Sequence, residues 1–173
     1  RSSAQSSSDQ GDVTADSVDI TTPSPKVERQ GPRPRLEIIA EEMEVARATD
    51  IPLALALVHV NRSEMLAEQG QDTVEQAEAL LLDALEEMAA GQRVERFGEL
   101  TYGIFYQGTI DDVEAWTVHT HQKMQRRSDL LKGGVSIGVT MMGPRHKHAK
   151  ALRTEAMKAL HESYKSGAPA LID

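Results

Sequence analysis

The chain has 173 residues, a formal net charge of −8 and a pI near 5.3, and it contains no cysteine. The absence of cysteine excludes disulfides, thiol nucleophiles and cysteine-ligated zinc, and it is typical of a reducing compartment. An acidic chain lacks the basic face that sequence-nonspecific nucleic-acid binding needs, so we expect no nucleic-acid partner. No apolar run approaches the roughly 18 residues that span a bilayer, so we expect no direct membrane insertion.

The first part of the chain differs in composition from the rest. Residues 1–31 are rich in Ser, Asp, Gln, Thr and Pro, and they lack aromatic residues and apolar periodicity. Such a stretch buries too little surface to offset its ordering entropy. We therefore expect a disordered polar linker over residues 1–33 and one folded domain over residues 34–173. Because the chain begins with Arg and not Met, we expect an upstream region, and a cytoplasmic domain with or without a tether to the inner membrane.

Apolar periodicity divides the folded part into alternating helices and strands. The sequence predicts helices at 35–49, 71–92, 109–127 and 148–166, strands at 51–61, 133–142 and 169–173, and a hairpin over 93–108. The nearly continuous apolar run of the first strand is typical of a strand buried on both faces of a sheet. This order of elements is the split βαβ arrangement. We therefore predict an α+β, ferredoxin-like fold with a central, mostly antiparallel sheet flanked by helices.

Local signals predict how the 71–92 helix and the hairpin are bounded. We expect Asp72 or Thr73 to cap the helix and Gly91 to end it. In the hairpin, Gly98 suits the first turn position of a type II′ turn.

Four short motifs then follow one another along the folded part. They are Ile51-Pro52-Leu53-Ala54-Leu55, Arg96-Phe97-Gly98-Glu99-Leu100-Thr101-Tyr102, Val135-Ser136-Ile137-Gly138-Val139, and Ala159-Leu160 with Gly167. In order and spacing they resemble the GGDEF family, the diguanylate cyclases, whose signature reads R-Y-G-G-D-E-F at the second motif. The resemblance covers about residues 35–173 and implies the nucleotidyl-cyclase palm. It also implies enzymes that join two GTP molecules into cyclic di-GMP with the help of metal-bound carboxylates.

The carboxylates that this chemistry needs are replaced in the present sequence. The signature loop reads Gly98, Glu99, Leu100, Thr101, Tyr102. Glu99 stands at the second glycine, and Leu100 and Thr101 stand at the two acidic positions. The D-x-D that ends the family's first strand falls at His59 and Asn61. Mg²⁺ prefers carboxylate oxygens to these groups, so we predict no catalytic residue, no metal site and no cofactor.

Other positions of the family pattern are also altered. The lysine of the last helix falls at Tyr164, and the N-D pair that helps recognise guanine falls near Ala67 and Glu68. The product-inhibition motif R-x-x-D begins at Ala89 and ends at Gln92. The resemblance therefore implies neither catalysis nor cyclic di-GMP binding at that site.

Residues near the signature loop allow a functional and a structural interpretation. Glu99 is a relic ligand or base, or a solvated turn residue that takes a glycine's place and closes the pocket. His59 is a titrating group or a ligand for a soft metal, or a hydrogen-bonded histidine at a strand end. For both residues we favour the structural interpretation. Leu100 and Tyr102 offer a further alternative, an exposed apolar patch for a partner.

Two histidine pairs have i, i+2 spacing. His119 and His121 lie on a predicted helix, where residues two apart do not share a face, which argues against a metal pair. His146 and His148 lie in or near a loop, where a metal pair is feasible, but no carboxylate partner is close in the sequence.

We conclude that the sequence favours a degenerate GGDEF domain without cyclase activity, in a larger bacterial protein of cyclic di-GMP signalling. We expect it to be a regulatory or protein-interaction module whose partner is another protein or an upstream domain of the same chain. Three alternatives stay open. The domain is a sensor that binds GTP or cyclic di-GMP without turnover, a divergent nucleotidyl cyclase, or a dimerisation module whose helix 35–49 forms the coiled stalk of a homodimer.

Overall fold

The computed structural model describes residues 32–126 and 134–173, with side chains from residue 35 onward. Residues 1–31 of the expected linker, and Arg127 and Gly133 at the ends of two expected elements, lie outside the described residues. Leu36–Asp173 form one compact unit. In chain order the elements are α1 (Pro32–Thr49), β1 (Leu53–Val60), α2 (Ser63–Glu68), α3 (Gln71–Met88), β2 (Arg93–Gly98), β3 (Thr101–Gln107), α4 (Ile110–Met124), β4 (Val135–Met141), α5 (Ala149–Ser166) and β5 (Ala170–Ile172).

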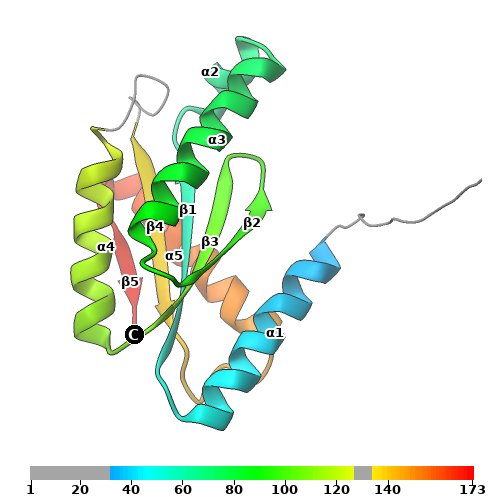
Figure 1. Ribbon diagram of the computed structural model, residues 1–173, viewed down its shortest axis with the longest axis vertical. Coiled ribbons are helices and arrows are strands. Elements are labelled where there is room, and N and C mark those ends of the chain that lie inside the picture. The colour runs from blue at the N-terminus through cyan, green and yellow to red at the C-terminus, as the bar shows by residue number, and fades with distance from the viewer. Residues whose placement is uncertain (1–31, 127–133) are drawn as a thin grey trace, which may run out of the picture. The chain divides into compact units, whose positions relative to one another are not determined.

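The strands form one mixed sheet in the order β2-β3-β1-β4-β5 (Figure 1). Strand β1 pairs antiparallel with both β3 and β4, and β2 pairs antiparallel with β3. Strand β5 pairs parallel with β4 at the edge. The predicted α+β class, the mostly antiparallel sheet and the central place of the first strand are confirmed. Every residue of β1 is buried except His59, which is half-buried.

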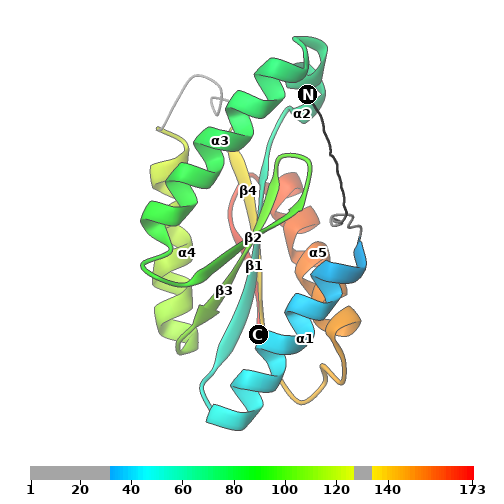
Figure 2. The same cartoon turned by 45° about the vertical axis from the view of Figure 1, so that its right-hand side comes forward.

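The two faces of the sheet are covered by different helix pairs. Figure 2 shows α3 and α4 on one side of the sheet and α1 and α5 on the other. The strict alternation of side chains along a strand explains this division. The even-numbered residues 54–60 of β1 pack with α3 and α4, and the odd-numbered residues 53–57 pack with α1 and α5. Because both faces are apolar, β1 reads as a continuous hydrophobic run in the sequence.

Helix α5 lies unusually close to β4, and Gly138 is the reason. A Cβ at this position would lie 2.0 Å from the backbone nitrogen of Leu160. Only glycine therefore allows the helix backbone to approach the strand this closely. The contact is fixed nearby by a buried hydrogen bond of 2.9 Å from the Ile137 N–H to the Ser163 hydroxyl. The last helix thus has a defined position against the sheet.

Two expected helix boundaries are wrong. Helix α3 begins after Gly70, whose φ is 114°, and no side chain caps it, so neither Asp72 nor Thr73 is the N-cap. The helix ends at Met88, before the expected Gly91, because two residues in the left-handed region follow, at positions 90 and 91. The six-residue α2 was not predicted, since so short a helix has no readable apolar period.

The hairpin turn also differs from the expectation. Gly98 pairs with Thr101 inside the ladder, after a register shift, and has no positive φ. The left-handed residue is Leu100, with a φ of 55°. The predicted type II′ turn starting at Gly98 is therefore wrong. Leu100 is fully buried and Tyr102 is 7% exposed, so the idea that these two side chains form an exposed apolar patch is also wrong.

Candidate functional site

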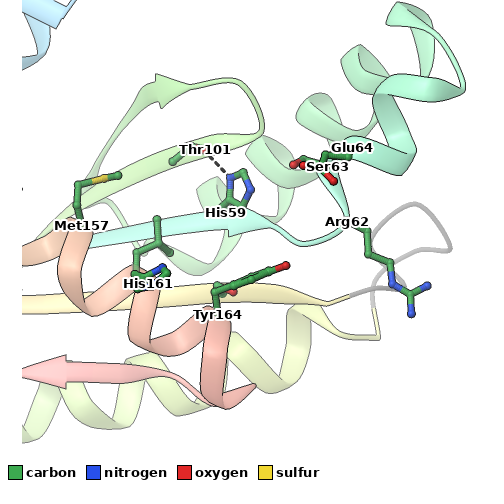
Figure 3. Close-up of a pocket in the computed structure, with 10 residues that line it drawn as sticks. His59, Arg62, Ser63, Glu64, Thr101, Met157, His161 and Tyr164 are labelled. Carbon is green, nitrogen blue, oxygen red and sulfur yellow. Dashed lines mark hydrogen bonds between the residues drawn. The ribbon is translucent and has the colours of Figure 1, made fainter.

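A pocket of about 420 Å³ opens at the end of β1, beside the start of the β3 strand (Figure 3). It is lined by His59, Arg62, Ser63, Glu64, Thr101, Ser136, Met157, Leu160, His161 and Tyr164. The central strands provide its floor, the β1–α2 turn one wall and α5 another. The antiparallel pairing of β1 with β3 and β4 brings His59 level with Thr101 and Ser136. Three positions far apart in the sequence therefore meet in one site.

His59 is held by the hairpin. Its Nδ1 lies 2.7 Å from the Thr101 hydroxyl, and that hydroxyl donates to the Glu99 carbonyl oxygen at 2.9 Å. Because the hydroxyl proton is committed to Glu99, His59 Nδ1–H is the donor to Thr101. Burial lowers the pKa of His59, against a smaller opposing effect of a backbone hydrogen bond with Leu100. His59 is therefore a neutral imidazole at pH 7 that bonds the strand end to the hairpin.

Asn61 holds the start of β4 in a similar way. The Ser136 hydroxyl donates to the Asn61 side-chain carbonyl at 2.7 Å, and the Asn61 backbone N–H donates to the Gly134 carbonyl at 3.0 Å. Arg62 then turns the chain into α2 with a φ of 59°. This left-handed residue places Ser63 and Glu64 at the pocket wall directly after the strand.

The α5 wall of the pocket is apolar except for His161, and it is largely open to solvent. Met157 is 48% exposed and Tyr164 is 61% exposed, while Leu160 between them is buried. His161 is exposed on the same side of the helix. Figure 3 shows Met157, His161 and Tyr164 projecting from α5 beside His59. Their spacing of i, i+4 and i+7 places all three on one helix face.

A carboxylate of α3 clamps the tip of the hairpin. The Leu100 backbone N–H donates to Glu78 at 2.7 Å, and Arg96 donates to both oxygens of the same carboxylate at 3.3 and 3.0 Å. Burial alone would raise the pKa of Glu78, but the hydrogen bonds from Arg96 and Leu100 outweigh it and hold the pKa below its ordinary value. The clamp satisfies the N–H of a left-handed, non-glycine residue. Arg96 therefore has a structural role in this loop.

The remaining loop residue, Glu99, is exposed at the hairpin tip, as expected for a solvated turn residue. It is not among the residues that line the pocket, so the expectation that it closes the pocket is wrong. Ala89 and Gln92, which stand where the family's R-x-x-D motif would begin and end, both make contacts within the domain. Ala89 is 1% exposed at the end of α3. The Gln92 side-chain amide accepts from the Gln107 N–H at 3.1 Å and donates to the Gln107 carbonyl at 3.4 Å. At the base of the hairpin, the Gln92 side chain thus makes the two hydrogen bonds that a paired backbone would make.

A second polar cluster joins β4, the following loop and α5. Glu155 accepts hydrogen bonds from Arg145 at 2.7 Å, His146 at 2.7 Å and Thr140 at 3.1 Å. The hydrogen bond from Arg145, with those from His146 and Thr140, outweighs burial and holds the pKa of Glu155 at about 2. His146 is 3% exposed, and its Nδ1 accepts the Gly143 N–H at 2.9 Å, so Nε2 carries the proton.

This cluster changes the interpretation of the second histidine pair. His146 has a carboxylate partner after all, Glu155, nine residues further along the chain. His148 caps α5 by accepting the Ala151 N–H. Of the first pair, His121 is buried and His119 is exposed, as expected for residues two apart on a helix. Within residues 35–126 and 134–173, no group of three or more His, Asp or Glu side chains converges as a metal site.

The sequence pointed to His59, Thr101 and Tyr164, which the structure brings to one pocket. It did not single out Arg62, Met157, His161 or Glu78. The only signal for the two α5 residues is their i, i+4, i+7 relation to Tyr164, and a helix face of that kind is easily taken for an ordinary solvated surface. Glu78 carries no local signal, because its partners are 18 and 22 residues away.

Comparison with solved structures identifies the fold. The GGDEF domain of DgcB from Caulobacter crescentus, in complex with c-di-GMP, superposes with a TM-score of 0.69 and 15% identity over 82% of this chain and 89% of that one. The active GGEEF domain of a diguanylate cyclase from Vibrio cholerae gives 0.70 and 12% identity over 83% and 97%.

The diguanylate cyclase SiaD from Pseudomonas aeruginosa, in complex with its activator SiaC, gives a TM-score of 0.63 and 18% identity over 82% of this chain and 57% of that one. No protein-family model and no curated protein matches the sequence. The chain thus has the fold of GGDEF domains, an α+β nucleotidyl-cyclase palm, as the four motifs predicted. In the described part of the chain, no helix is both long and apolar enough to cross a membrane.

Proposed function

We propose that this domain is a catalytically inactive, GGDEF-like regulatory and protein-interaction module of a bacterial, cytoplasmic signalling protein related to cyclic di-GMP. One observation carries the proposal. The Nδ1 of His59 and the hydroxyl of Thr101 form a 2.7 Å hydrogen bond at the end of β1. In the family pattern these positions, together with Leu100, belong to acidic residues, and the first acid of the strand binds metal.

The physical argument concerns the charge of Mg²⁺. This hard cation requires oxygen ligands, and carboxylates supply the negative charge that compensates it. A neutral imidazole and a hydroxyl supply no such charge, and both are already hydrogen-bonded to each other. The side chain of Leu100 is fully buried and offers no ligand. Without metal, the attacking hydroxyl and the triphosphate of GTP are neither oriented nor neutralised.

The direct test is a product assay. The chain is incubated at micromolar concentration with GTP and either Mg²⁺ or Mn²⁺, beside the Vibrio cholerae GGEEF domain as a positive control. We expect no cyclic di-GMP from this chain. Measurable product would contradict the proposal and would favour the divergent cyclase.

The second candidate function is a nucleotide sensor without turnover. The observation in its favour is the pocket itself, which has a volume of about 420 Å³ and Arg62 and His161 among its lining residues. A volume in this range accommodates small ligands. Calorimetry with GTP and with cyclic di-GMP separates the candidates, because heat with either nucleotide supports a sensor. No heat with both leaves the protein-interaction role.

The packing of α1 argues against the dimerisation alternative. Ile39, Met43 and Ala46 are buried against the domain's own sheet, so the apolar stripe is already used. On its outward side the described part of α1 exposes Glu37 and Glu44. A coiled stalk needs an apolar seam toward the partner helix. Analytical ultracentrifugation of Val45→Asp, which alters the largest exposed apolar side chain of α1, should give the same mass as the unmodified chain.

A further inference from the structure

Helix α5 and the loop before it differ in charge from the rest of the chain. Residues 142–167 contain six basic residues, Arg145, Lys147, Lys150, Arg153, Lys158 and Lys165, against two acidic residues, Glu155 and Glu162. The whole chain nevertheless has a net charge of −8. Helix α3 shows the opposite extreme, because its six charged residues are all acidic: Asp72, Glu75, Glu78, Asp83, Glu86 and Glu87. Positive charge is therefore concentrated on α5 and on the loop that precedes it, which carries Arg145 and Lys147.

Most of this positive charge is not neutralised within the domain. Glu155 is already occupied by Arg145, His146 and Thr140. Glu162 lies 3.7 Å from Lys165. Among the described residues, the basic side chains at 147, 150, 153 and 158 form no ion pair. A partner with negative charge would meet little competition from the domain's own carboxylates.

The same helix exposes apolar side chains beside the pocket. Met157 and Tyr164 are two of the six large apolar residues that stand out from the described surface, and both line the pocket. We call the α5 face the surface made by Met157, His161 and Tyr164, flanked by Lys158 and Lys165. Apolar side chains at i and i+7, on either side of His161 and next to a pocket, are suited to receive the apolar side of an amphipathic helix.

We propose that the α5 face is a docking surface for an acidic amphipathic segment of a partner protein. Apolar side chains of the segment would lie against Met157 and Tyr164 and enter the pocket. Its carboxylates would face the lysines of α5. This inference rests on the proposed function, because it names the partner class of the interaction module.

The charge distribution favours an acidic protein segment over nucleic acid. A phosphate backbone would approach Lys158 and Lys165, but nucleic acid has no aliphatic side chain to pack against the exposed Met157. An acidic helix carries its charge and its apolar side chains on separate faces, as the α5 face requires.

The test uses the full chain and two fluorescein-labelled helical peptides of 18 residues, a length of roughly five turns. In the first, leucines at helical spacing alternate with glutamates, and in the second every glutamate is replaced by lysine. Fluorescence anisotropy should show the acidic peptide binding at least about tenfold more tightly than the lysine peptide. Raising the salt concentration should weaken this binding, because the charges involved are exposed.

Variants locate the binding. Met157→Asp and Tyr164→Asp should each weaken the acidic peptide about tenfold or more, because each removes an apolar contact and adds a repelling charge. Val118→Asp is the matched control, since Val118 is 47% exposed on α4, on the opposite side of the sheet. It should leave the affinity unchanged. Circular dichroism confirms that all three variants are folded.

Three results would overturn the inference. They are no binding of the acidic peptide, equal binding by the unmodified chain and the two α5 variants, and tighter binding of single-stranded DNA or anionic phospholipid vesicles than of the peptide. Each of these leaves the proposal of catalytic inactivity intact. Formation of cyclic di-GMP from GTP would instead remove the proposed function and this inference together.

Discussion

The two sides of the sheet differ in the size of their apolar core and in the polar and exposed groups beside it. On the α3/α4 side, two helices without a net positive charge close over a large apolar core, and the Trp116 indole N–H donates to the Met88 carbonyl at 2.8 Å to join them. On the α1/α5 side the apolar core is smaller, and a polar cluster, a pocket and exposed apolar side chains adjoin it. The α3/α4 side therefore serves mainly to stabilise the fold. The α1/α5 side has the pocket and the exposed apolar side chains that a partner could contact.

The end of β1 sharpens this contrast. On the α3/α4 side of this end, Val60 and Leu100 are buried in the apolar core. On the other side, His59 and Thr101 face the pocket. The residues that pack the signature hairpin into the apolar core, Val60 and Leu100, are thus distinct from those that line the pocket. Point substitutions can test this difference, and we expect their effects to decrease from Gly138 to Glu99.

Replacing Gly138 by Ala should have the largest effect on stability. The new Cβ would lie 2.0 to 2.5 Å from backbone atoms of Leu160 and Ala159, which cannot move without displacing α5. We expect a loss of about 3 kcal/mol or more in the free energy of unfolding, measured by urea denaturation. Gly98→Ala is the matched control, because the nearest atom to its Cβ is 3.9 Å away. It should cost about 1 kcal/mol at most.

Replacing Glu155 by Gln should come second and should depend on pH. The pKa of Glu155 in the folded chain is about 2, below its ordinary value of 4.5. The charged form therefore stabilises the fold above about pH 5, and this contribution is lost as the pH falls toward 2. At pH 7 we expect Glu155→Gln to cost about 2 kcal/mol, since the side chain is only 24% exposed and loses charge-assisted hydrogen bonds.

The pH profile provides the check on this explanation. Urea denaturation of both proteins between pH 7 and pH 3 should show the gap in unfolding free energy closing as the pH falls. A gap that stays constant over this range would mean that packing, and not charge, accounts for the effect.

Replacing Glu78 by Gln should have a smaller effect, confined to the hairpin. The neutral amide loses the ion pair with Arg96 but still accepts the Leu100 N–H through its oxygen. We expect a cost of about 1 kcal/mol. Amide hydrogen exchange should quicken in β2 and at residues 99–102 while β1 and β4 stay protected. Uniform acceleration across the sheet would contradict a local clamp.

Replacing Glu99 by Gly should have the smallest effect. Glu99 is exposed and does not line the pocket, so restoring the family's glycine supplies no missing carboxylate. We expect no cyclic di-GMP from the variant and an unfolding free energy within about 0.5 kcal/mol of the original. A cyclase gained from this single change would contradict the account of the loop.

The fold could be predicted from the sequence because its signals are local. The apolar run of β1, the stripes of α1 and α3 and the left-handed Gly167 that ends α5 follow from periodicity and caps. The errors lie where long-range contacts override local chemistry. Leu100 adopts a left-handed φ that a glycine was expected to take, because Glu78 binds its N–H and the core buries its side chain.

The candidate site could be predicted only in part. The resemblance to the GGDEF family predicts from the sequence that His59, Leu100 and Thr101 stand where that family has carboxylates. The hydrogen bond between His59 and Thr101 is not predicted, because it depends on the register of β1 against β3, 42 residues away. The partnership of His146 with Glu155 was missed for a similar reason, since it requires the loop to fold back on α5.

The most direct test of the central claim is a Mn²⁺ titration in the presence of GTP, followed by NMR line widths. The claim is that the end of β1 holds no divalent cation, because His59, Asn61 and Thr101 replace the family's acids. We predict that the backbone amide signals of His59, Asn61, Thr101 and Ser136 keep the line widths of the rest of the chain at equimolar Mn²⁺. Selective broadening of these four signals would place a paramagnetic ion in the pocket and contradict the account.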